Sequence, residues 1–103
     1  MARKVVWTES AWRDLEQAAD YIARDSPHYA AAFVLEVNSA SATLAHLPHR
    51  ARKVPELNDP SIRELLVGSY RLIFLVSGES VYILGLIHQA RDFRRVGDLD
   101  SEE

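Results

Sequence analysis

The side chains that could bind an anion or exchange a proton lie mostly in the second half of this 103-residue chain. Eight basic residues occur between positions 50 and 95, against five acidic ones. Guanidinium and ammonium groups hold phosphates and carboxylates. The eight are Arg50, Arg52, Lys53, Arg63, Arg71, Arg91, Arg94 and Arg95. The second half can therefore present a basic face, although a weaker one than a strong nucleic-acid binder usually has.

The composition excludes several other chemistries. The chain has no cysteine, which excludes a disulfide, a thiol nucleophile and cysteine-based zinc sites. Its four histidines, His28, His46, His49 and His88, lack the i, i+4 spacing of a helical metal site. His88 ends an apolar run, and a histidine at the rim of a sheet is more often solvated or a cap than a base. We therefore predict no metal and no cofactor.

The length of the chain supports a single domain. Apolar residues make up 48% of it, and a domain of this size buries about two-thirds of its unfolded surface, enough for a packed core. Four of the 15 acidic residues follow Gly97. We predict one domain over residues 1–97 and an acidic tail over residues 98–103. No apolar run reaches the ~18 residues of a membrane span and no signal peptide is recognisable, so we expect a cytoplasmic protein without a membrane partner.

Two amphipathic helices are predicted in the first half. Thr8 offers an N-cap, and apolar residues then recur at helical spacing to residue 24. Ser26-Pro27 is a second helix start, a capping hydroxyl followed by proline at the first helical position. We expect helices over residues 9–24 and 27–47, the second ending before Pro48. With almost no linker between them, they should form an antiparallel hairpin.

The second half changes from helical to strand periodicity. Residues 49–61 contain two prolines and Asn58-Asp59-Pro60, which is typical of a surface loop. β-branched and aromatic runs follow at 62–67, 70–76 and 81–87. Together with a short β-prone run at residues 5–7, they predict an α+β fold of order β-α-α-β-β-β. Its three-stranded antiparallel meander should pack on the helical hairpin.

The turn at Gly78-Glu79 predicts the register of the last two strands, because a two-residue hairpin loop with glycine first fits a type II′ turn. The predicted pairs are Phe74–Ile83, Val76–Val81 and Tyr70–Ile87. We expect this apolar face, with Leu72, to pack against the helices. The helix residues predicted to be buried there are Leu15, Ile22, Phe33, Val37 and Leu44. The opposite face should be mixed and exposed in the free chain. It would carry Ser69, Arg71, Ile73 and Leu75 beside Tyr82, Leu84, Leu86 and His88.

Over residues 5–93 the sequence resembles the RelE/ParE superfamily of toxins from type II toxin–antitoxin pairs, and the ParE branch in particular. The resemblance depends on short motifs in the order helix start, helix end, strands and chain end. They are Trp7-Thr8-Glu9 with Ala11 and Asp14-Leu15, Tyr21-Ile22, Pro48, Arg63-Glu64-Leu65, Tyr70-Arg71-Leu72-Ile73-Phe74 and Ile87-His88-Gln89-Ala90-Arg91-Asp92-Phe93. His88-x-x-Arg91-Asp92 after a Tyr-Arg strand and a helical hairpin is the most specific of these.

The resemblance implies a small toxin that a cognate antitoxin neutralises. ParE-like members inhibit DNA gyrase, whereas RelE-like members cleave messenger RNA on the ribosome. RelE-like cleavage needs a proton acceptor, a proton donor and cations at the phosphate. Where RelE-like strands carry lysines this chain has Ile62 and Glu64, and no tyrosine follows Phe93. We therefore expect a gyrase-binding inhibitor with no catalytic residues of its own.

Two alternatives to the gyrase inhibitor stay open. Some ribosome-dependent relatives combine a glutamate, an arginine and a histidine, which Glu56, Arg71 and His88 could reproduce here. The chain would then be an endoribonuclease acting on ribosome-bound messenger RNA. In the other alternative, it is a non-toxic relative that still binds an antitoxin.

The expected contact residues are basic. By the ParE reading, Arg91, Arg94 and Arg95, together with Arg71, should bind the target. An amphipathic, partly acidic antitoxin segment should bind the mixed sheet face and the basic loop. Its expected contacts are Arg52, Lys53, Arg63, Arg71 and Tyr82. Arg71 also has a structural interpretation, because Glu64 would lie diagonally across the neighbouring strand, within ion-pair reach.

Overall fold

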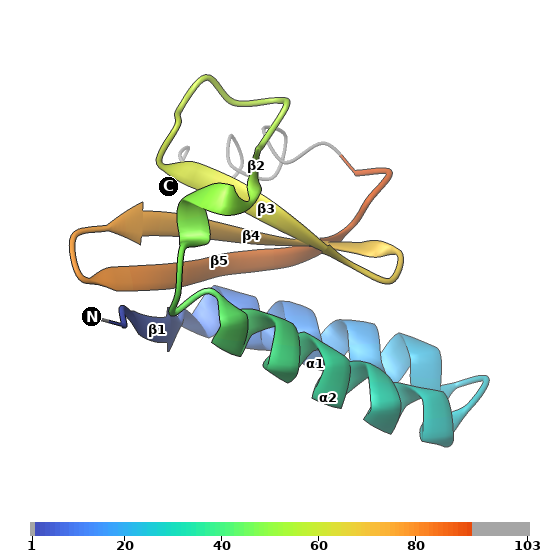
Figure 1. Cartoon of the computed structure of the whole chain (residues 1–103). Helices are drawn as coiled ribbons and strands as arrows, with labels where there is room; N and C mark the ends of the chain where they lie inside the picture. The colour runs from blue at the N-terminus through green and yellow to red at the C-terminus, as the bar shows by residue number, and fades with distance from the viewer. Residues whose placement is uncertain (1, 92–103) are drawn as a thin grey trace.

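The computed structural model describes residues 2–91, which begin with a strand and a helical hairpin (Figure 1). The elements are β1 (Lys4–Trp7), α1 (Glu9–Ala23) and α2 (Pro27–Thr43). Both predicted caps are confirmed: the hydroxyl of Thr8 accepts from the Ala11 amide, and that of Ser26 accepts from the Tyr29 amide, each at 3.2 Å. These bonds satisfy amides that the first helical turn leaves without a partner. The predicted limits of the domain and its acidic tail lie outside the described residues.

The second helix ends at Thr43, four residues before the predicted limit. Proline disfavours a helical conformation in the residue before it, and Leu47 before Pro48 has a left-handed φ of 51°. The carbonyl of Ala45 instead accepts a hydrogen bond from the Arg3 amide at 2.8 Å. The helix α2 therefore ends before the predicted residue, and the backbone that follows it is hydrogen-bonded to the N-terminal segment.

Five strands form one sheet in the order β1-β5-β4-β3-β2 (Figure 1). After the short 3-10 helix Pro48–Arg50, the strands are β2 (Arg52–Lys53), β3 (Ile62–Val67), β4 (Tyr70–Ser77) and β5 (Ser80–His88). The antiparallel meander is confirmed. The sheet is larger than predicted because β1 pairs in parallel with β5, and because two residues of the expected surface loop pair with β3.

The predicted turn at Gly78-Glu79 is confirmed, and a second tight turn lies at Gly68-Ser69. Val67 pairs with Tyr70 and Ser77 with Ser80, so each loop has two residues. Gly68 and Gly78 both have a φ of +58°, a conformation that glycine adopts without steric penalty.

The register between β4 and β5 changes part-way along the strands. Near the turn, the predicted pairs Phe74–Ile83 and Val76–Val81 are confirmed. The predicted pair Tyr70–Ile87 is wrong, because Tyr70 lies opposite His88. The cause is a β-bulge, which adds one residue to β5 and shifts every later pair by one.

Asp14 of α1 binds the bulged strand. Ile83 and Gly85 pair with successive residues of β4, which leaves Leu84 between them without a partner. The Asp14 carboxylate accepts a hydrogen bond from the Leu86 amide at 3.0 Å. A side chain at Gly85 would approach that carboxylate, since a Cβ there would lie 3.1 Å from the Asp14 oxygen. The bulge and the helix are thus fitted to each other.

The bulge exchanges the faces of the last residues of β5. Leu86, predicted on the mixed face, is buried in the core against the helices. His88 lies on this helix side beside Tyr70, and Ile87 lies opposite Arg71 on the other face. A one-residue shift has this effect because side chains alternate along a strand.

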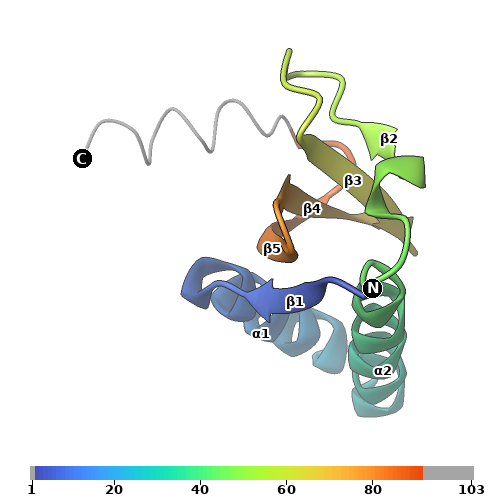
Figure 2. The same ribbon diagram turned by 60° about the vertical axis from the view of Figure 1, so that its left-hand side comes forward.

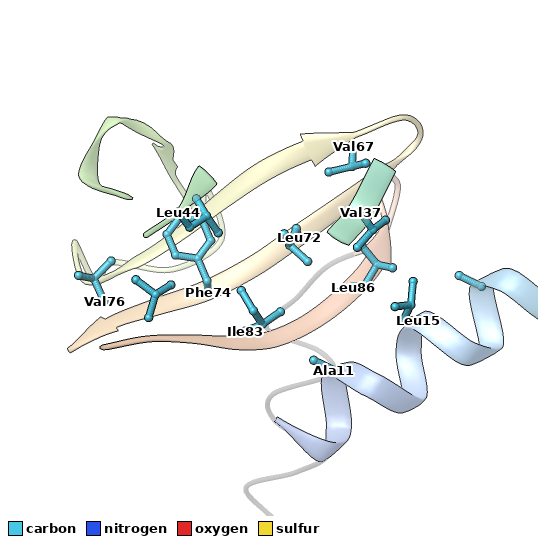
Figure 3. Packing of buried hydrophobic residues seen from close by; sticks show 12 residues of the cluster. Ala11, Leu15, Val37, Leu44, Val67, Leu72, Phe74, Val76, Ile83 and Leu86 are labelled. Carbon is cyan, nitrogen blue, oxygen red and sulfur yellow. The ribbon is translucent and has the colours of Figure 1, made fainter. Parts of the chain in front are cut away.

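The main core lies between the helical hairpin and the sheet (Figure 3). The predicted core residues Leu15, Val37, Leu44, Leu72, Phe74 and Ile83 are all buried there. Phe33 and Ile22 are only partly buried, contrary to expectation. Within residues 2–91, no helix is both long and apolar enough to cross a membrane.

The opposite face of the sheet is covered by the segment around β2, which both views place away from the helices (Figures 1 and 2). The predicted exposure of this face is wrong for Arg71 and Ile73, whose exposed fractions are 4% and 0%. Glu56 of the covering segment binds Arg71, and Val54 beside it is buried. The expected surface loop therefore closes a second buried layer.

Candidate functional site

Arg71 is at the centre of a buried charge cluster on the face of the sheet away from the helices. Its Nε donates to Glu64 at 2.8 Å, and Glu56 accepts from both Nη atoms at 2.6 Å. Nη1 also donates to the backbone carbonyl of Arg91 at 2.8 Å. The guanidinium thus joins β4, β3, the loop after β2 and the end of the described chain.

The second carboxylate oxygen of Glu64 binds Arg52, so that two arginines and two glutamates form one network. Glu64 is 1% exposed, and Arg52 reaches it from the edge strand β2. Burying such charges is favourable only when each has a partner, a condition this cluster meets. No buried side-chain nitrogen or oxygen among the described residues is without a hydrogen bond.

The surrounding carboxylates keep Arg71 charged. The hydrogen bond to Glu56 raises the pKa of Arg71 above its ordinary value, burial opposes that shift, and Glu64 adds to it. Because the pKa of Arg71 is raised in the folded protein, its contribution to the free energy of unfolding is fully present at any pH below the pKa of arginine in the unfolded chain. That range includes neutral pH. Arg71 therefore carries its positive charge at neutral pH and is a fixed part of the cluster.

His88 lies on the other face of the sheet, in an aromatic group near the connection between α1 and α2. The rings of Phe33 and Tyr70 are 5.1 Å apart, and those of Tyr70 and His88 are 5.6 Å apart. The Ala90 amide donates to Nδ1 of His88 at 3.2 Å, which orients the imidazole.

Two adjoining hollows surround this aromatic group, with volumes of about 340 and 510 Å3. Tyr21, Tyr70 and His88 line both. Tyr21 is 64% exposed, so the surface between helices and sheet is aromatic and accessible. Arg91 lines the smaller hollow.

The proposed catalytic set of the nuclease alternative is only partly brought together. Glu56 and Arg71 are in direct contact, but His88 extends from the opposite face of the sheet. Both Nη atoms of Arg71 donate to Glu56, and the Arg71 side chain is buried, so neither nitrogen is available to a phosphate. In this arrangement the three residues do not face one substrate.

The expected antitoxin contacts lie on both faces of the sheet. The register and the alternation of side chains place Arg52, Arg71 and Tyr82 on the outer face, whereas Lys53 and Arg63 point the other way at the β2 edge. Arg63 donates to three backbone carbonyls, at Pro60, His49 and Ala51.

The expected target contacts are only partly described. Arg91 is exposed, and Arg94 and Arg95 lie outside the described residues. Arg71 offers no exposed side chain to a target but binds the backbone of Arg91. Within residues 2–91, no group of three histidine or acidic side chains could hold a metal ion.

Sequence reasoning missed the role of Asp14. No contact was predicted for this acidic residue of α1, yet its carboxylate binds the bulged strand. A signal was available: Asp14 follows Ala11 by three residues and precedes Ala18 by four, which places it beside the apolar face. Thr8 has a similar second role, since its hydroxyl donates to the Ile83 carbonyl at 2.7 Å.

Comparison with known proteins gives the family. The family model described as ParE toxin of type II toxin–antitoxin system, parDE, matches residues 5–93. This chain belongs to the ParE toxin family. It is also 36% identical over 89 residues to Toxin RelE2 of Caulobacter vibrioides, an alignment that covers 85% of this chain and 97% of that protein.

Two solved structures have the fold of this ParE-family toxin. The chromosomal ParDE system from P. aeruginosa superposes with a TM-score of 0.70 at 22% identity, covering 84% of this chain and 96% of that one. The toxin–antitoxin complex RelBE2 from Mycobacterium tuberculosis gives a TM-score of 0.59 at 27% identity, with 88% and 95% covered. The predicted α+β fold and the predicted RelE/ParE superfamily are therefore confirmed.

Proposed function

We propose that this type II toxin arrests growth by binding DNA gyrase, without a catalytic site of its own, and that a cognate antitoxin neutralises it. The observation that carries the proposal is the state of Arg71. In an RNA-cleaving site, an arginine must offer its N–H groups to a phosphate. Here four donor contacts of Arg71 go to two glutamates and a carbonyl, beneath a covering segment.

Among the expected target contacts within residues 2–91, Arg91 is accessible, which supports a binding mechanism. Arg91 is exposed, and it borders the aromatic hollow lined by Tyr21, Tyr70 and His88. Aromatic side chains and arginines are the residues that most often contribute binding energy at protein interfaces. We assign Arg91, with Arg94 and Arg95 that follow it in the sequence, to the target.

The antitoxin partner is supported by the solved relatives, which are toxin–antitoxin systems. Of the expected contacts, Arg52, Lys53 and Tyr82 have exposed surface, whereas Arg71 does not. An extended acidic segment along the β2 edge would meet the first two. Its apolar residues could also cover Leu66, which is 48% exposed on β3.

Two observations support the endoribonuclease alternative. Toxin RelE2 of C. vibrioides carries the name of the other branch, and Glu56 contacts Arg71 in this chain. A nuclease would have to open the covering segment and release Arg71.

Arg91→Ala should weaken growth arrest strongly, while His88→Ala should leave most of it. A central interface arginine contributes about 2 kcal/mol or more, which corresponds to roughly a thirtyfold loss of affinity. Colony formation after induction of each variant measures the difference, with immunoblots to equalise toxin levels. Arg13→Ala, which removes an exposed arginine of α1, is the matched control and should arrest growth fully.

The nuclease alternative predicts the reverse order. His88→Ala would then abolish arrest, and mapping of messenger RNA ends would show cuts on translating ribosomes that this variant no longer makes. A wild-type chain that neither arrests growth nor inhibits gyrase would instead indicate a relative that only binds an antitoxin.

A further inference from the structure

The last described residues are held at four points after β5. The Gln89 amide donates to the Ser69 carbonyl and the Arg91 amide to the His88 carbonyl, each at 2.9 Å. The Ala90 amide donates to the His88 ring. The acceptors of these three bonds belong to Ser69, in the turn between β3 and β4, and to His88, the last residue of β5. The fourth comes from the buried guanidinium of Arg71 to the Arg91 carbonyl.

Arg71 can fix that carbonyl because its own orientation is fixed. Glu64, on the neighbouring strand, holds Nε at one edge of the guanidinium plane. Glu56, from the covering segment, accepts from both Nη atoms. A planar group held at both edges cannot rotate, so Nη1 stays directed at Arg91.

We propose that Arg71 is a positioning residue, which fixes the direction in which the chain leaves the sheet at Arg91 and thereby orients the Arg91 side chain for target binding. Glu56 acts through Arg71, since it completes the contact that fixes the guanidinium. This inference rests on the proposed function, in which the target-binding arginines begin at Arg91. It assigns Arg71 a role without contact to target or substrate.

Arg71→Lys is the direct test. A lysine keeps the positive charge between the glutamates, but its single nitrogen cannot bind both carboxylates and the Arg91 carbonyl in one fixed geometry. The matched control is Arg3→Lys, because Arg3 also donates to a distant backbone carbonyl, that of Gly78, at the other end of the sheet.

Amide hydrogen exchange, followed by NMR, reports the positioning separately from the target. In Arg71→Lys the amide of Arg91 should exchange about tenfold faster, because one hydrogen bond of ordinary strength changes a local opening equilibrium by about that factor. The amide of Gln89, whose acceptor Ser69 does not involve Arg71, should keep its rate. Arg3→Lys should change neither.

Growth arrest then tests the consequence. Arg71→Lys should lose arrest by about tenfold or more in colony formation. Val37→Ala is the stability control: it removes a fully buried side chain of the helix–sheet core, and should lower the melting temperature yet retain both arrest and the protection of Arg91. Should Arg71→Lys fail to fold, Glu56→Gln, which replaces one of the two oxygens that accept from Arg71 with an amide donor, is measured the same way.

Faster exchange at Arg91 together with lost arrest supports the inference. Unchanged exchange at Arg91, faster exchange with full arrest, or equal acceleration at Gln89 overturns it. Failure of the proposed function would be seen in a different measurement, in which wild-type toxin leaves supercoiling by gyrase intact. Failure of the positioning role and failure of the proposed function can therefore be distinguished.

Discussion

Arg71→Ala is expected to lower the free energy of unfolding by about 3–5 kcal/mol, because it leaves buried carboxylates without their cation. Glu64 suffers most, since its side chain has no exposed surface and would keep only Arg52 as an ionic partner. For a chain of this size, such a loss lowers the melting temperature by well over ~10 °C. Urea denaturation of purified protein measures it.

Two comparisons make this expectation specific. Arg13→Ala removes an arginine from an ion pair that is also short, 2.5 Å to Glu9, but whose partners are 67% and 81% exposed. It should change the unfolding free energy by less than about 0.5 kcal/mol. In the double variant Arg71→Ala/Glu64→Ala, the loss should be smaller than the sum of the two single losses, because removing the carboxylate relieves the unpaired charge. Additive losses would contradict the cluster.

Phe74→Ala is expected to cost about 3–5 kcal/mol in the free energy of unfolding, through lost burial and the cavity left behind. Phe74 is fully buried where β4 faces the helical hairpin (Figure 3). Leu35→Ala is the matched control, since Leu35 lies on α2 with 67% of its surface exposed and should change stability by less than about 0.5 kcal/mol. Equal melting temperatures for Phe74→Ala and wild type would contradict the packing of sheet on helices.

The elements of this fold could be predicted because their signals are local. Thr8 and Ser26 cap helices by accepting hydrogen bonds from amides three residues away. Gly78 has the positive φ that its own turn requires. The strands β3, β4 and β5 were placed within one residue at each end. Caps, periodicity and turn glycines act over a few residues, which is the range that sequence patterns cover.

The misplaced features depend on contacts between distant segments. The bulge in β5 is fitted to Asp14, which comes 72 residues before its partner Leu86, and the missed bulge put Leu86 and His88 on the wrong faces. Strand β2 forms only through pairing with β3. Neither leaves a signal in its own few residues.

The candidate site was predicted in composition more than in geometry. The ion pair of Arg71 with Glu64 followed from strand register and is confirmed. The burial of that pair did not follow, because it depends on a proline-containing loop folding back to place Glu56 over the sheet. Arg71, which the sequence suggested as a target contact, therefore connects β3, the covering segment and Arg91 through its hydrogen bonds.

The proposed mechanism is tested most directly by DNA supercoiling with purified components. Relaxed plasmid, ATP and DNA gyrase are incubated with increasing toxin, and the topoisomers are separated by electrophoresis. We expect wild type and His88→Ala to inhibit supercoiling, Arg91→Ala to need a roughly thirtyfold higher concentration, and the antitoxin to restore the reaction. Full supercoiling at an excess of folded toxin, with messenger RNA cleaved on ribosomes by the same preparation, would contradict the account.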